Sequence, residues 1–87
     1  MSDKPIKAEG VLERDVGDEW MLYDAENRVV HVLNETALFI WRLCDGEHTE
    51  EQIATETIAT YEIAPEQAAT DVAACLATLR EAGALQP

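Results

Sequence analysis

The chain has 87 residues, of which 18 are acidic and six are Lys or Arg, so its formal net charge is −12 at pH 7. A chain of this length forms one small domain, and so acidic a balance argues against a nucleic-acid partner, whose phosphates would be repelled. No apolar stretch is long enough to cross a membrane and the N-terminus lacks the apolar core of a signal peptide, so we expect a cytoplasmic protein.

The first half of the chain alternates with a period near two, which is typical of strands. Residues 1–9 are polar and are expected to form a flexible tail, which leaves residues 10–87 as a single domain. Three strands are predicted, because apolar and β-branched residues there lie between turns that contain Gly or Asn. The predicted strands span residues 10–14, 19–24 and 28–33. Such short turns predict an antiparallel meander with the second strand in the centre.

From residue 34 onward the apolar period becomes 3.6, which predicts three helices. Asn34 is a good N-cap for a first helix over 36–44, which we expect to end at Gly46. The sequence at 49–52 has the form of a capping box for a second helix, and Pro65 suits the first position of a third. The order predicts an α+β, winged-helix-like fold in which a three-stranded antiparallel sheet is followed by three helices.

The usual catalytic constellations are missing from the sequence. The only serine, Ser2, lies in the tail, which excludes a Ser–His–Asp triad and the attachment serine of a carrier protein. The four glycines are scattered and form no phosphate-binding loop. The carboxylates crowd turns, caps and helix exteriors, which indicates either a solubilising surface or a field that steers a basic partner. We therefore expect a binding protein and not an enzyme.

The cysteines and histidines do not match a closed metal site. Cys44 and Cys75 lie 31 residues apart without a CxxC pair, and we interpret both as reduced core thiols rather than a disulfide or metal ligands. His31 falls on the third predicted strand and His48 in a loop, at a spacing that suits no zinc site. No cofactor is therefore expected.

Two features favour the binding of an extended peptide. The third predicted strand carries only Arg28 as a charge that would deter edge pairing, and such an edge accepts a further strand. The third helix has, beside its apolar stripe, a flank of mostly small side chains. This flank consists of Ala69, Ala73, Leu76, Ala77 and Arg80. Its alanines either raise helix propensity or let another backbone approach closely.

Several segments, taken in order and spacing, resemble the PqqD-like family. They are DEWMLYD at 18–24, RVVHVLNETA at 28–37, IWRLCDG at 40–46, DV at 71–72 and LATLREAG at 76–83. The resemblance covers about residues 11–85, and its most specific pieces are LNETA at 33–37 and the segment at 40–46. Ala64 departs from the pattern, because an acidic or polar cap is more usual there. That difference bears on helix capping and not on function.

The resemblance implies a RiPP recognition element, the domain that binds the leader segment of a ribosomally made precursor peptide. Such a domain presents the peptide to a modifying enzyme, often a radical SAM enzyme, as PqqD does in pyrroloquinoline quinone biosynthesis. In this family the leader adds as a strand along strand three and packs against helix three. On this chain the leader would pair with the backbone of Val29, Val30, His31, Val32 and Leu33. Its side chains would enter a groove lined by Val30, Val32, Ala69, Val72, Ala73 and Leu76, with Arg80 facing a peptide carboxylate.

Two other interpretations stay open at this point. A general protein-interaction adaptor of the same fold would have no role in peptide modification, and a precursor gene beside a modifying-enzyme gene would separate the two. A winged-helix DNA-binding protein is disfavoured by the charge. A free sheet edge also permits either a monomer or an edge-strand dimer.

Overall fold

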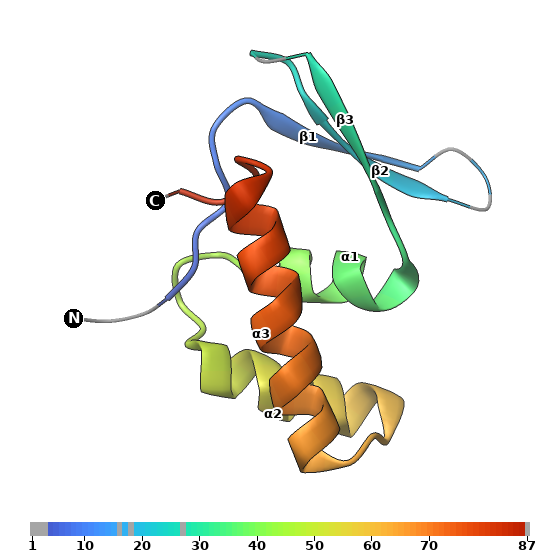
Figure 1. Cartoon of the computed structure of the whole chain (residues 1–87), viewed down its shortest axis with the longest axis vertical. Helices are drawn as coiled ribbons and strands as arrows, with labels where there is room; N and C mark the ends of the chain where they lie inside the picture. Colours follow the sequence, from blue (N-terminus) through green and yellow to red (C-terminus); the bar gives the residue numbers. More distant parts are fainter. Residues whose placement is uncertain (1–3, 16, 18, 27, 87) are drawn as a thin grey trace.

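Three strands precede three helices along the chain, as the sequence predicts (Figure 1). The elements are β1 (Val11–Asp15), β2 (Trp20–Asp24), β3 (Val29–Leu33), α1 (Glu35–Arg42), α2 (Glu50–Tyr61) and α3 (Pro65–Glu81). The structure, a computed structural model, describes residues 4–15, 17, 19–26 and 28–86. Positions 1–3 of the expected tail and positions 16, 18 and 27 of the expected turns lie outside the described residues. The predicted α+β class is confirmed.

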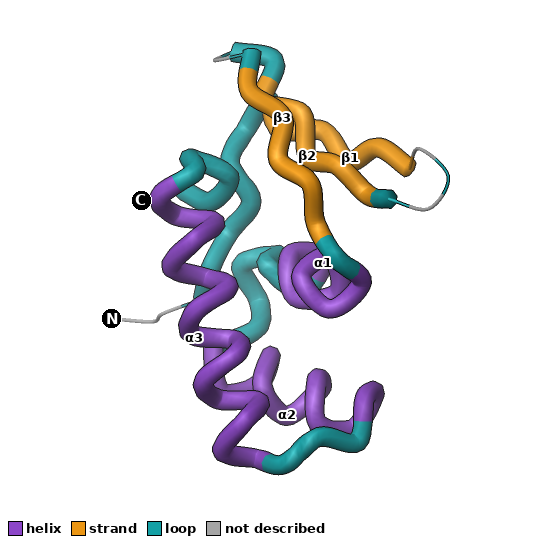
Figure 2. The backbone as a smooth tube through the Cα atoms, turned by 45° about the vertical axis from the view of Figure 1, so that its right-hand side comes forward, coloured by secondary structure: helices purple, strands orange, loops and turns teal. Residues whose placement is uncertain are grey.

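The sheet is an antiparallel meander in the order β1-β2-β3, so β2 is central as expected. Residues paired across strands point to the same face, and successive residues alternate. Leu22 of β2 is fully buried and is paired with Glu13 and His31, which places these side chains on one face. We call it the inner face. Figures 1 and 2 show all three helices on one side of the sheet, and the ion pair between Glu13 and Arg42 of α1 identifies that side as the inner face.

Local hydrogen bonds explain where the first two helices begin. The Asn34 side chain accepts a hydrogen bond from the Ala37 backbone N–H at 2.8 Å and caps α1. Thr49 and Gln52 form the predicted capping box of α2, with reciprocal bonds of 3.1 and 2.8 Å. α1 ends at Arg42 with Leu43 as its C-cap, earlier than the expected Cys44, and Gly46 follows in the loop with a φ of +81°.

Residues 5–8 lie against the core and differ from the flexible tail expected for 1–9. We call this segment the N-terminal clasp. Its backbone bonds are Lys7 N–H to Cys44 O at 3.0 Å, Ala8 N–H to Ala84 O at 2.9 Å, and Gln86 N–H to Ile6 O at 2.9 Å. A Cβ on Gly46 would lie 3.0 Å from Ile6 Cγ1, and the φ of +81° also favours glycine there. The boundary between tail and domain stays a prediction.

The core lies between the inner face and the helices. Its fully buried members include Leu22, Ile53, Val72 and Leu76. Both cysteines are free, as expected, but only Cys44 is buried, since Cys75 is half-buried. Burial raises the pKa of Cys44 to about 12 and that of Cys75 to about 11, so both thiols stay protonated at neutral pH. None of the helices in the described part of the chain has the length and hydropathy needed to span a bilayer.

Candidate functional site

β3 forms an edge of the sheet. Among the described strands it pairs only with β2, so alternate backbone N–H and C=O groups along its other side have no strand partner. In the view of Figure 2, β3 is drawn on the side of the sheet toward α3. The predicted free edge over residues 29–33 is therefore present, and a groove beside it would have α3 as its far wall.

Side chains of β3 divide between the two faces of the sheet. Val29, His31 and Leu33 point to the inner face, because they are paired with Asp24, Leu22 and Trp20. Val30 and Val32 point to the opposite face, where they are 51% and 58% exposed. The structure therefore does not bring Val30 and Val32 together with side chains of α3. The buried Leu22 and Leu33 set this register, and a shift by one residue would invert both faces.

The two flanks of α3 differ in exposure. Val72 and Leu76, predicted to line the groove, are fully buried in the core and support the helix from within. Ala69, Ala73 and Arg80 are exposed on one flank. The opposite flank carries Asp71 and Cys75, which are half-buried. At 100° per residue the buried stripe separates these flanks, so Ala69 and Ala73 do not share a surface with Asp71 and Cys75.

One cavity adjoins the C-terminal end of β3 and reaches α3. It has a volume of about 230 Å³ and is lined by Asn34, Thr36, Ala37, Ile40, Asp71 and Cys75. Sequence reasoning missed this site, because it assigned Ala37 and Cys75 to core stripes. The apolar period shows which side of each helix faces the core. It does not show which edge of that side borders a cavity. The small size of Ala37, opposite a cysteine, was the available signal.

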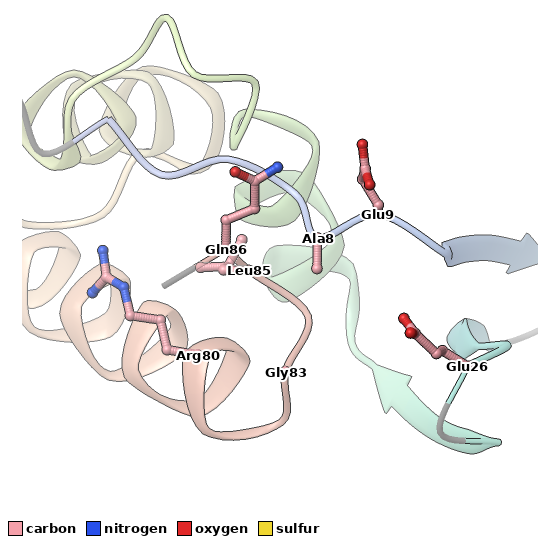
Figure 3. A pocket seen from close by; sticks show the side chains of 7 residues that line it. All are labelled: Ala8, Glu9, Glu26, Arg80, Gly83, Leu85 and Gln86. Carbon is pink, nitrogen blue, oxygen red and sulfur yellow. The ribbon is translucent and has the colours of Figure 1, made fainter.

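A larger, open cavity lies beside the C-terminal end of α3, and Glu26 of the β2–β3 turn is among its lining residues. Its volume is about 990 Å³, and its lining residues are Ala8, Glu9, Glu26, Arg80, Gly83, Leu85 and Gln86. Figure 3 shows Arg80 on one side of the opening, with Glu9 and Glu26 on the other. Arg80 is thus a predicted contact from α3 that lines a cavity. β3 has five residues and spans roughly 17 Å at 3.4 Å per residue, and a further cavity of about 340 Å³ is lined by Val32 and Leu33 at its C-terminal end.

His31 lies midway along this edge, on the inner face. Its Nε2 atom is buried and has no hydrogen-bond partner among the described residues. A buried polar atom left unpaired costs about 1–3 kcal/mol, so a group that offers it a hydrogen bond is favoured. In the part of the chain that the structure describes, no three His, Cys, Asp or Glu side chains are placed to hold a metal. The arrangement provides free backbone hydrogen-bonding groups on β3 and nearby recesses with mixed polar and apolar linings.

Comparisons with known proteins identify the family and the fold. A family model described as coenzyme PQQ synthesis protein D (PqqD) matches residues 19–85. TbiB1 in complex with the TbiA(beta) leader peptide superposes with a TM-score of 0.81 at 20% identity, over 93% of this chain and 94% of that chain. Lasso peptide synthetase B1 complexed with the leader peptide superposes with a TM-score of 0.81 at 27% identity, over 97% and 99%. Among curated protein sequences no match is found.

Proposed function

The chain belongs to the PqqD family, and on that premise we propose that it binds the leader segment of a ribosomally made precursor peptide and presents it to a modifying enzyme. The observation that carries the proposal is the unpaired edge of β3, and α3 helps to line cavities that include Glu26, before the strand, and Asn34, after it. Two structures of the same fold, TbiB1 and lasso peptide synthetase B1, are complexes with leader peptides, which supports this assignment.

The leader would add to β3 as a fourth strand. Both existing strand pairs are antiparallel, and antiparallel pairing is slightly more stable per residue, so we propose an antiparallel peptide. Its side chains would alternate in direction. Those that turn inward lie between β3 and α3, next to Val29 and His31, and an apolar anchor would enter the cavity beside Ala37 and Cys75. The proposed site therefore keeps the predicted backbone pairing over residues 29–33. Its helix wall is the flank of α3 that carries Cys75, in place of the flank that carries Ala69 and Ala73.

Charged side chains at the larger cavity would select the part of the peptide beyond the strand. Glu9 and Glu26 on one wall favour a basic residue, and Arg80 on the other favours a carboxylate. An antiparallel peptide runs toward this end of β3, so the residues that follow the leader strand would pass here. The net charge of −12 adds a long-range attraction for basic segments.

In this proposal the chain itself does no chemistry. A bound peptide held near the modifying enzyme reacts at a raised effective concentration, which increases turnover without a catalytic group on this domain. The radical SAM class of that enzyme, the cytoplasmic location and the choice between monomer and edge-strand dimer stay predictions from the sequence.

The decisive experiment is a titration of ¹⁵N-labelled protein with synthetic leader peptides from a precursor encoded beside this chain's gene. We expect the largest chemical-shift changes at residues 28–34 of β3 and around Asp71 and Cys75. A scrambled leader peptide is the control. Changes confined to the exposed flank at Ala69 and Ala73 would contradict the site. Binding of the modifying enzyme without any peptide binding would favour the adaptor interpretation.

Proline substitutions in β3 test strand addition directly. Consecutive residues of an antiparallel edge strand direct their N–H alternately to the neighbour and to the free side. One of Val30→Pro and His31→Pro therefore removes an outward donor and leaves the bonds to β2 intact. We expect that variant to fold, by circular dichroism, and to bind the leader at least about tenfold more weakly. The other should lower the melting temperature. Full leader affinity in the folded variant would exclude pairing at β3.

A further inference from the structure

The face of the sheet turned away from the helices is apolar and uncovered. We call it the outer face, and its residues are Leu12 and Arg14 of β1, Met21 and Tyr23 of β2, and Val30 and Val32 of β3. Leu12, Tyr23 and Val30 form one row across the strands, and Arg14, Met21 and Val32 form the next. Leu12 is 49% exposed, and Val30 and Val32 are more than half exposed. Antiparallel sheets with one solvated face usually place polar residues there.

Charge sets the outer face apart from the rest of the molecule. The chain has 18 acidic residues, yet the six outer-face positions include no acid and one base, Arg14. The acids within the strands, Glu13, Asp15 and Asp24, all lie on the inner face. An apolar patch free of like charge, on a chain that is strongly acidic elsewhere, is complementary to an apolar surface with basic side chains around it.

We propose, on the basis of the proposed function, that the outer face is the docking surface for the modifying enzyme. The enzyme surface that fits is apolar, carries a carboxylate opposite Arg14 and is bordered by basic residues. A leader strand paired with β3 would extend the outer face, because every second side chain of that strand would stand beside Val30 and Val32. Leader and domain together then form one surface, and the enzyme recognises the loaded domain better than the empty one.

The size of the face suits a transient contact with any partner, and the net charge of the chain disfavours a second copy. Three strands of five residues cover roughly 14 by 17 Å, or about 240 Å², and a fourth strand adds about a third more. A stable interface buries about 800 Å² on each partner, so the face alone does not support a permanent dimer. Two copies, each with a net charge of −12, would also repel one another. A transient contact that strengthens when the leader is bound suits the transfer of a substrate.

The test compares two acidic substitutions of exposed apolar residues. Leu12→Glu places an acid on the outer face, two strands away from the peptide edge. Ile6→Glu is the matched control, because Ile6 is 43% exposed and lies in the N-terminal clasp, next to Gly46. The probes are the synthetic leader peptide and the purified modifying enzyme encoded beside this chain's gene, measured separately and together by isothermal titration calorimetry.

For the wild type we expect the leader to raise enzyme affinity at least about threefold. Leu12→Glu should weaken enzyme binding at least about tenfold and leave leader affinity within about twofold, whereas Ile6→Glu should change neither. Arg14→Glu, at an exposed position that should not affect folding, is the second variant and should weaken enzyme binding at least about threefold.

Failures of the two proposals give different results. If the wild type does not bind the leader, the proposed function fails. If the leader binds but the enzyme binds Leu12→Glu and Arg14→Glu as tightly as the wild type, or does not bind at all, the docking surface is refuted. A wild-type dimer in sedimentation that Leu12→Glu dissociates would assign the outer face to a second copy and would also overturn the inference.

Discussion

Both faces of the sheet carry large apolar side chains, but the helices pack only against the inner face. On the inner face Leu22 is fully buried and Leu33 is 9% exposed, because the helices cover them. On the outer face Leu12, Val30 and Val32 are 49%, 51% and 58% exposed. The fold therefore leaves a second apolar face of the sheet uncovered. Such a face is typical of a surface that contacts another molecule.

The largest expected effect comes from shortening one leucine on each face. Leu22→Ala should lower the free energy of unfolding by about 3 kcal/mol, because it leaves a cavity in the core. Leu12→Ala, on the neighbouring strand but the outer face, should cost less than about 1 kcal/mol. Urea unfolding followed by tryptophan fluorescence measures both. Equal losses of unfolding free energy for the two variants would mean that the outer face is also covered by other side chains in solution.

A smaller effect is expected from filling the cavity between α1 and α3. Ala37→Leu places a larger side chain where a leader anchor is proposed to sit, and it should weaken leader binding by about tenfold. Ala73→Leu makes the same change on the exposed flank of α3 and should leave leader affinity within about twofold. Fluorescence anisotropy of a labelled leader peptide measures both affinities. If Ala73→Leu weakened leader binding more than Ala37→Leu, the small-residue flank of α3 would be the binding surface.

The smallest expected effect concerns the ion pair that joins the inner face to α1. Arg42 Nε donates to Glu13 at 3.1 Å, and this hydrogen bond holds the pKa of the Glu13 carboxyl below its usual value. Arg42 is more than half exposed, so we expect Arg42→Ala to cost less than about 1 kcal/mol at pH 7.

The sign of the pH dependence follows from the lowered pKa of Glu13. The contribution is present above the usual carboxyl pKa of 4.5 and is lost as the pH falls through the lower folded-state value. The stability difference between Arg42→Ala and the wild type should therefore shrink between pH 5 and pH 3 in urea titrations. Arg14→Ala is the control, because Arg14 lies on the outer face of β1, the strand that carries Glu13. Its effect on stability should not change with pH over this range. A constant difference across that range would show that Arg42 acts by packing alone.

The sequence predicted the elements well because each has a local signal. Alternation marked the strands to within one residue, and Asn34, Thr49 and Pro65 marked the three helix starts. It could not assign Val30 and His31 to their faces, because alternation fixes which residues share a face but not which face the helices cover. The same limit applies to α3, where the apolar stripe did not reveal that Cys75, and not Ala73, borders a cavity.

The N-terminal clasp has a consequence for the folding pathway. The bridge between Lys7 and Leu85 joins positions 78 residues apart, which is nearly the full length of the chain. Closing so long a loop in an unfolded chain costs about 4 kcal/mol in entropy, and much less once the sheet and helices have brought the two segments together. The bridge should therefore close last on refolding and open first on unfolding, so that the amide hydrogens of Ala8 and Gln86 exchange with solvent before those of the core.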